Sequence, residues 1–241
     1  DPAARENMFQ QVVACIERVV RQAGCSIEEL AGIGLGVPGK VNTNDGVAEF
    51  QNNLPWRDFP LAQRIREVFP VERVVVDNDV YMATFAEWVA YGQVRDETFV
   101  FLTVSTGISC CTIHNGAFIR GAGFAGEVGF LPVAGEARTG YLSLEIASAG
   151  PGIERLAKNQ NFVNATPEKV IEAYRNGDST ALDVMNEVLN YWAKGLYVIA
   201  CVLDPDKLVL GGGVINRNPD LLEPLKTSLQ NYVHPFQADF V

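Results

Sequence analysis

Hydrophobic side chains near the start of the chain recur at the spacing of a helix. Between Met8 and Ala23 they return every three or four residues, and Gly24 follows them. This pattern predicts an amphipathic helix with one face in a core, ending at the glycine. Ser26 and Glu29 then have the spacing of a capping box, which predicts a short helical turn.

Strand-like and helix-like segments alternate after this turn. Runs of apolar and β-branched residues predict strands at 32–39 and 71–79, and helical periodicity predicts helices at 60–69 and 79–92. The connections between these segments are short. Because such alternation is typical of α/β layers, we predict an α/β fold.

The hydrophobic pattern changes from Thr98 onward. Closely spaced strands are predicted at 98–104, 110–116 and 117–121, and Asn115-Gly116 is a strong hairpin signal between the last two. Helical periodicity then returns. We predict helices at 151–159, 166–177, 179–203 and 220–232, and one more buried strand at 206–215.

The sequence between these two regions contains no linker-like run, and the chain contains no internal repeat. We therefore expect a hinge near residues 95–98 rather than a flexible tether. This predicts two lobes, 1–96 and 97–241.

The composition excludes several classes of protein. A formal charge of −10 and a pI near 4.7 provide no basic face, so direct nucleic-acid binding is not expected. No apolar run approaches the roughly 20 residues that cross a bilayer, so we expect no membrane span and a cytoplasmic protein. The five cysteines form no Cys-x-x-Cys pair, and the two histidines lie far apart, which predicts buried reduced thiols and no metal cage.

The pair Asn78-Asp79 lies where a predicted strand gives way to a helix. Such strand ends line the ligand crevice in open α/β sheets. A carboxylate at this place can accept the proton of a hydroxyl that attacks a phosphoryl group. The alternative is that Asp79 only caps the helix.

Five other short segments contain residues suited to ligands, and each has a purely structural alternative. "GVPG" at 36–39 and "LGGGVI" at 210–215 allow close backbone approach, but plain turns and packing explain them too. "FQNNLPW" offers two amides for polyol hydroxyls, or a turn with Trp56 in the core. The glycine-rich segment 121–130 contains one carboxylate, Glu127. The turn "STGIS" at 105–109 is either a phosphate turn that has lost glycines or a plain strand connection.

In their order and spacing these motifs resemble the ROK family of sugar kinases and sugar-responsive repressors. The match runs from about Gly32 to Val214, and its most specific parts are the Asn78-Asp79 pair and the Gly-Glu-x-Gly element around Glu127. The resemblance implies a two-lobed, actin-like ATPase fold of the ribonuclease H-like type, with sugar and ATP meeting in an interlobe cleft.

The resemblance also implies a role for each matching residue. Asp79 would be the general base that deprotonates the sugar hydroxyl. The sugar hydroxyls would be held by Gly39, Asn53, Asn78 and Glu127. Thr106 and Gly107 would face the ATP phosphates, Gly211 and Gly212 would lie against the nucleotide, and Mg²⁺ would arrive with ATP.

The chain departs from the family pattern at both ends and in the zinc region. The family's Asp-x-Gly-Gly-Thr motif and first strands have no counterpart, so we expect a chain truncated at both ends, with an incomplete first lobe. The family's zinc-binding histidine is replaced by Phe130, and residues 131–147 contain no cysteine or histidine. We therefore expect no structural zinc.

Two further departures concern binding residues. The family's second sugar glutamate lies four residues before a serine, whereas Glu145 lies three before Ser148, so a one-residue deletion would give Glu145 that role. The family's Gly-Thr-Gly-x-Gly-Gly turn has Ser105, Ser109 and Cys110 in place of glycines. Added Cβ atoms near the phosphates predict weaker ATP binding.

Three functions follow from these observations. The first is an ATP-dependent kinase for a hexose or a hexose-containing sugar, expected to be a homodimer. The second is a non-catalytic, sugar-binding regulatory domain of the repressor type, which would need a DNA-binding segment before Asp1. The third is a structural fragment that binds neither ligand well.

Overall fold

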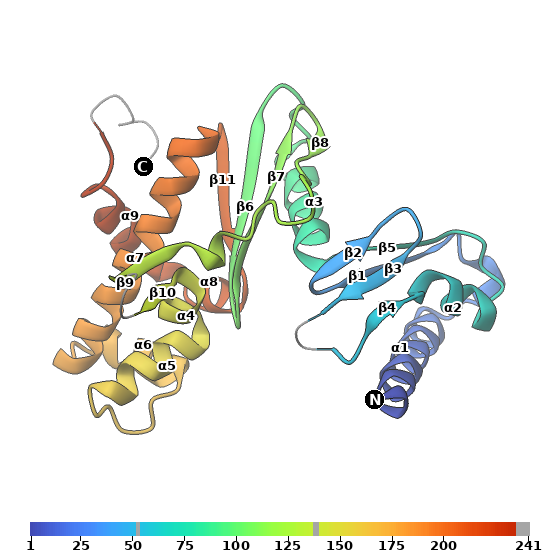
Figure 1. The fold of residues 1–241 in the computed structure, drawn as a ribbon, viewed down its shortest axis with the longest axis horizontal. Helices are drawn as coiled ribbons and strands as arrows, with labels where there is room; N and C mark the ends of the chain where they lie inside the picture. Colours follow the sequence, from blue (N-terminus) through green and yellow to red (C-terminus); the bar gives the residue numbers. More distant parts are fainter. Residues whose placement is uncertain (52–53, 137–139, 235–241) are drawn as a thin grey trace. The chain divides into compact units, whose positions relative to one another are not determined.

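The computed structural model describes residues 1–51, 54–136 and 140–234. Contacts between residues divide the chain into two compact units, Asp1–Ala86 and Glu87–Val241. The division falls inside helix α3 (Asp79–Tyr91), ten residues before the end of the predicted lobe 1–96. The functional lobes 1–96 and 97–241 stay a prediction, and Figure 1 shows the elements of the two compact units.

The first unit combines a parallel pair of strands with an antiparallel sheet and two helices. β1 and β5 are parallel, with Leu35 opposite Val76, and the second sheet has the order β2-β3-β4. Its elements are α1 (Pro2–Ala23), the turn η1 (Ile27–Glu29), β1 (Ile33–Val37), β2 (Lys40–Asn42), β3 (Val47–Phe50), β4 (Arg57–Phe59), α2 (Leu61–Val68), β5 (Val74–Asn78) and the start of α3.

The core of this unit confirms the predicted amphipathic helix. Phe9 and Val13 of α1 are buried against Ile65 of α2, and Gly24 ends α1 with a φ of 68°. The capping box is present, because Glu29 Oε2 accepts a hydrogen bond from Ser26 N at 2.7 Å. Burial of these apolar side chains stabilises the layer of helices on the strands.

Trp56 lies in this core with 1% of its surface exposed, and its Nε1 donates to Arg5 O at 3.2 Å. The structural explanation for this part of "FQNNLPW" is therefore confirmed. The two amides of the segment, Asn52 and Asn53, lie outside the described residues.

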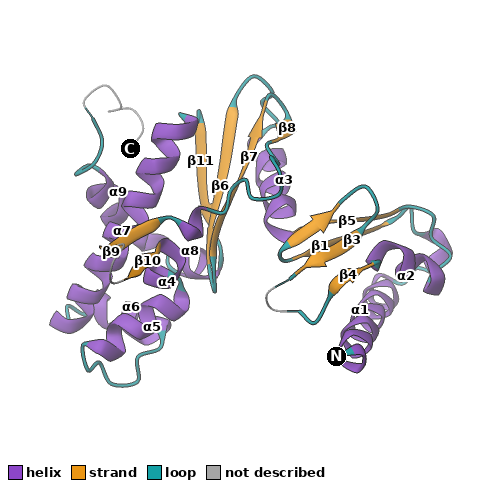
Figure 2. Cartoon of the chain, in the orientation of Figure 1, coloured by secondary structure: helices purple, strands orange, loops and turns teal. Residues whose placement is uncertain are grey.

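The second unit is built on a mixed sheet with the order β11-β6-β7-β8 (Figure 2). β11 is parallel to β6, and the other pairs are antiparallel. Its elements are the end of α3, β6 (Thr98–Val104), β7 (Ile108–His114), β8 (Ala117–Phe118), η2 (Val128–Phe130), β9 (Pro132–Glu136), β10 (Gly140–Ser143), α4 (Leu144–Ser148), α5 (Gly150–Asn159), α6 (Pro167–Arg175), α7 (Ser179–Leu203), β11 (Lys207–Gly211), α8 (Gly213–Arg217), η3 (Pro219–Leu221) and α9 (Leu222–Leu229).

Alternate residues of β6 face opposite sides of this sheet. Val100 and Leu102 point into the core shared with α7, whereas the Phe99 ring lies 5.8 Å from the Tyr91 ring, between centroids. Helix α7 is apolar around much of its circumference, and most of its length is buried in this core. The long predicted helix at 179–203 is therefore confirmed with its exact bounds.

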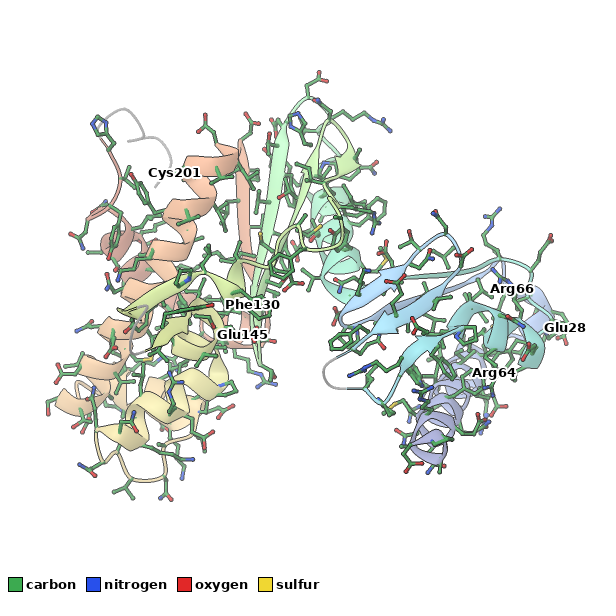
Figure 3. All side chains as sticks on the ribbon, viewed as in Figure 1. Glu28, Arg64, Arg66, Phe130, Glu145 and Cys201 are labelled. Atoms are coloured by element: carbon green, nitrogen blue, oxygen red, sulfur yellow. The ribbon has the colours of Figure 1, made fainter. Side chains whose placement is uncertain are left out.

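The five cysteines differ in exposure, and Cys25 is partly buried. Cys110 and Cys111 are buried at neighbouring positions of β7, and burial raises the pKa of Cys110 to about 12, so this thiol stays protonated. Cys15 and Cys201 are exposed, Cys201 on α7 (Figure 3). The expectation of buried thiols is wrong for these two, because each lies on the solvent side of its helix.

Several predicted boundaries need correction. The strand expected at 117–121 ends at Phe118, and the strand expected at 206–215 ends at Gly211, where α8 takes over. The last helix is shorter than predicted, covering 222–229 instead of 220–232. Within 1–51, 54–136 and 140–234, none of the helices combines the length and hydrophobicity that a membrane span needs.

Candidate functional site

The carboxyl ends of β1 and β5 hold the predicted Asn78-Asp79 pair in the first unit. Because the two strands are parallel and in register, they end side by side. Asn78 Nδ2 donates to Gly39 O at 2.9 Å, which joins two of the predicted sugar residues. Gly39 has a φ of 81°, and a Cβ there would lie 2.2 Å from Phe50 O, so this approach requires glycine. Asn53 lies outside the described residues.

Asn78 provides the cap of α3. Its Oδ1 accepts hydrogen bonds from Val80 N at 2.9 Å and from Tyr81 N at 3.3 Å. Asp79 Oδ1 also accepts from Val80 N, at 3.0 Å, but the Asp79 side chain remains exposed. Since Asn78 already satisfies the first amides of the helix, capping does not by itself account for a carboxylate at Asp79.

The turn Ser105–Gly107 joins β6 to β7 in the second unit. Ser105 N donates to Gly107 O at 2.9 Å, directly beyond the last strand pair, Val104 and Ile108. Thr106, at the tip of the turn, is exposed. The segment is therefore a hairpin turn with an exposed residue at its tip.

The residues that replace glycines in this turn do not strain it. Ser105, Ser109 and Cys110 are all described, and none of them has a positive φ. Gly107 is the exception in steric terms, because a Cβ there would lie 2.6 Å from Glu145 Oε2. The turn thus tolerates side chains at these three positions, whereas a side chain at Gly107 would have to displace the Glu145 carboxylate.

Helices α4 and α5 hold this turn from both sides. Glu145 Oε2, on α4, accepts a hydrogen bond from Ile108 N at 2.9 Å. Gly150 N, at the start of α5, donates to Ser105 O at 2.9 Å. Glu145 therefore contacts the backbone beside the predicted phosphate turn, whereas the resemblance gave it a sugar hydroxyl.

Glu127 is held next to the same hairpin by two packed glycines. A Cβ on Gly126 would lie 1.8 Å from Cys110 O, and one on Gly129 would lie 2.2 Å from Ile108 O. Gly126 O also accepts from Cys110 N at 2.8 Å. These two glycines therefore allow the segment to pack closely against the backbone of β7. They serve close packing, not loop flexibility.

Burial raises the pKa of Glu127, and the nearby negative charge of Glu145 raises it further. Gly129 contacts Glu145, and their segments η2 and α4 lie together in the second unit, where Figure 3 labels Phe130 and Glu145. The structure thus brings Glu127, Glu145 and the turn Ser105–Gly107 into one cluster.

Replacing Glu145 with glutamine should lower the pKa of Glu127. The substitution removes the second cause of the raised pKa and leaves burial in place, so the Glu127 pKa should fall but stay above its ordinary value. Carboxyl-carbon NMR titration measures the change. Glu154→Gln, which removes a half-exposed carboxylate on α5, is the matched control. An unchanged Glu127 pKa in Glu145→Gln would contradict the pairing.

A pocket of about 780 Å³ opens beside the turn, a size suited to a nucleotide. Gly213 borders it, and a Cβ there would meet nothing closer than 4.0 Å, so the backbone of α8 faces open space. These features fit a nucleotide whose phosphates lie near Thr106. The pocket is lined by Ser105, Thr106, Gly150, Pro151, Glu154, Pro167, Glu168, Ile171, Glu172, Arg175, Gly213, Val214, Arg217 and Asn218.

The predicted nucleotide residues Gly211 and Gly212 lie beside this pocket without lining it. A Cβ on Gly211 would lie 2.6 Å from the Phe101 ring, and one on Gly212 would lie 2.5 Å from Val104 O. Both glycines therefore let the turn between β11 and α8 pack against β6. The glycine that faces the pocket is the third one, Gly213, which the sequence reasoning did not select.

Sequence reasoning also missed the contribution of α5 and α6 to the pocket. The "GPG" at 150–152 was a usable signal, because it starts a helix with little side-chain bulk. Arg175 of α6 gave no such signal, and it is held by Asp220 and by Asn218 Oδ1 at 2.7 Å. In the part of the chain that the structure describes, no three His, Cys, Asp or Glu residues gather as a metal site.

The chain belongs to the ROK family, whose sequence profile matches residues 2–241. Known members that it resembles include both enzymes and regulators. It is 31% identical over 237 residues to a glucokinase of Halalkalibacterium halodurans, covering 89% of this chain and 71% of that protein. It is 25% identical over 230 residues to a xylose repressor of Caldicellulosiruptor bescii, covering 86% of this chain and 56% of the repressor.

Solved structures confirm the actin-like ATPase fold that the resemblance implied. The ROK hexokinase of Thermus thermophilus superposes with a TM-score of 0.76 and 30% identity, over 94% of this chain and 76% of the hexokinase. The family and the fold are therefore established.

Proposed function

We propose that the protein is an ATP-dependent kinase for a hexose or a hexose-containing sugar, with Asp79 as the general base. The observation that carries this proposal is the exposed Asp79 carboxylate at the joined ends of β1 and β5, where Asn78 already caps the helix. The glucokinase and hexokinase relatives support the same reaction class.

In this proposal Gly39, Asn53, Asn78 and Glu127 hold sugar hydroxyls, and Glu145 supports the phosphate turn. Thr106 and Gly107 face the ATP phosphates. Gly211 and Gly212 shape the turn that presents Gly213 to the nucleotide pocket.

The proposed reaction is one in-line displacement. A sugar hydroxyl oxygen bonds to the γ-phosphorus of ATP, the bond from that phosphorus to the β,γ-bridging oxygen breaks, and ADP leaves. Asp79 accepts the hydroxyl proton and releases it to solvent. Mg²⁺ would be held mainly by the ATP phosphates and would neutralise part of their charge.

A coupled assay of ADP release, with a panel of hexoses and β-glucosides, tests the proposed function. We expect ADP release that depends on one class of sugar and saturates with its concentration. ADP release at the same rate without sugar, or none with any sugar of the panel, would count against a kinase.

The second candidate is a sugar-binding regulatory domain without phosphoryl transfer. It is favoured by the loss of glycines at Ser105, Ser109 and Cys110, and by the similarity to a repressor. Calorimetric sugar binding without ATP binding or ADP release would select this candidate. A cytoplasmic location and a homodimer stay predictions.

A further inference from the structure

Two segments that are distant in the sequence line the nucleotide pocket. Helix α6 contributes five lining residues, the last of which is Arg175, and the segment 213–218, which contains α8, contributes four. Each segment is anchored in the core by a buried side chain, Val170 on α6 and Ile215 on α8. The distance between these two segments therefore determines how wide the pocket is.

Arg175 joins the two segments. Its Nε donates to Asp220 Oδ2 at 2.7 Å and its Nη2 donates to Asp220 Oδ1 at 2.6 Å, which is the bidentate geometry of a strong guanidinium–carboxylate pair. Nη2 also donates to Asn218 Oδ1 at 2.7 Å, and Asn218 Nδ2 donates to Val214 O of α8 at 2.7 Å. Arg175, Asn218 and Asp220 thus form a clamp between the end of α6 and the main chain of α8.

A second ion pair joins the same two segments, but it is looser than the clamp. Arg217 Nη1 lies 3.9 Å from Glu168 Oε1, and the two side chains are 75% and 69% exposed. Such exposed pairs contribute little. Arg175 and Asp220 are less exposed, and the hydrogen bonds from Arg175 lower the pKa of Asp220, so this carboxylate stays ionised well below neutral pH. The clamp is therefore the firmer connection.

One edge of the Arg175 guanidinium is committed to protein atoms. The N–H groups of Nε and Nη2 bind Asp220 and Asn218, so this edge does not bind a ligand. We propose that Arg175 is a positioning residue, which fixes the width of the nucleotide pocket by clamping the end of α6 to Asn218 and Asp220. Without the clamp, ATP has to order the two segments when it binds, and this loss of entropy weakens its binding. The proposal rests on the proposed function, because it concerns the pocket assigned there to ATP.

Calorimetry with Mg²⁺ and the non-hydrolysable ATP analogue AMPPNP tests the clamp. Arg175→Ala should weaken AMPPNP binding roughly three- to tenfold, and Asp220→Ala should weaken it by a factor in the same range. The double variant should bind about as weakly as the weaker single variant, because both substitutions break one connection. Arg175→Lys keeps the charge without the bidentate fork, so its affinity should lie between those of Arg175→Ala and the wild type.

Kinetics and a control variant separate positioning from folding and from net charge. In the assay of ADP release, Arg175→Ala should raise the KM for ATP by the same factor, while kcat and the KM for sugar stay within about twofold. Lys226→Ala removes another exposed cation of the second unit, whose Nζ lies 3.9 Å from Glu223 Oε1, and it should leave AMPPNP affinity unchanged.

Several outcomes would overturn the clamp. Fully additive losses in the double variant would show that Arg175 contacts the nucleotide directly. Unchanged AMPPNP affinity in Arg175→Ala, with or without a lower thermal midpoint, would leave Arg175 at most a role in stability. An equal loss in Lys226→Ala, or no AMPPNP binding by the wild type, would also contradict the proposal. Coupled losses of AMPPNP affinity without ADP release for any sugar would defeat the kinase proposal and support the clamp.

Discussion

Asp79→Asn should lower kcat by about 10²- to 10⁴-fold, the contribution that a positioned general base usually makes. Asparagine keeps the size of the side chain but cannot accept the hydroxyl proton as the oxygen attacks phosphorus. Because Asn78 caps α3, the substitution should leave the fold intact. The coupled assay of ADP release measures kcat, and calorimetry measures sugar affinity, which should change by no more than about twofold.

Asp183→Asn is the matched control for this experiment. Asp183 is exposed on α7, and its substitution removes the same charge as Asp79→Asn does, so kcat should not change. If Asp79→Asn retains the wild-type kcat, the assignment of the general base is wrong. A loss of sugar affinity that equals the loss of kcat would indicate a binding role instead.

Gly126→Ala should destabilise the second unit by roughly 2–5 kcal/mol, the sum of overpacking and a strained backbone. Gly126 has a φ of 90°, and a Cβ would lie 1.8 Å from Cys110 O, which is a backbone atom of a central strand. The thermal midpoint should fall by roughly 5–15 °C. Sugar binding should weaken as well, because the segment that carries Glu127 must move away from β7.

Gly177→Ala separates the two causes of this loss. Gly177 has a φ of 77° and lies in the same unit, but a Cβ there would meet nothing within 4 Å. It should therefore cost only the backbone strain, about 1–2 kcal/mol. Equal thermal midpoints for the two variants would show that the contact with Cys110 O is not a clash in solution.

The long, periodic elements could be predicted from the sequence, and the short ones could not. Helix α7 repeats its apolar pattern over about seven turns, so its bounds at 179 and 203 could be predicted from the sequence. The sheet β2-β3-β4 consists of strands such as 40–42, in which Lys40 and Asn42 show no clear alternation. Such strands are defined by their partners across turns, which local spacing does not reveal.

The candidate site also has one part that could be predicted from the sequence and one part that could not. The position of Asn78-Asp79 at a strand end follows from a buried run that meets a helix, so it could be read from the sequence. The pocket depends on α5, α6 and α8 meeting beside the turn, which is a property of packing between distant segments. To identify Gly213, and not Gly211 or Gly212, as the glycine that faces the pocket, one must know which atoms surround each of the three residues.

The hydrogen bonds to Ser105 O and Ile108 N have a consequence for how this hairpin can vary between relatives. Its shape is imposed by neighbouring helices through main-chain atoms, which every amino acid possesses. Substitutions within the turn should therefore change the shape of the hairpin little, whereas replacement of Glu145 should change it. A motif search that requires glycines at 105, 109 and 110 would overlook such members, whereas one that pairs a short hairpin with a distant acidic residue would retain them.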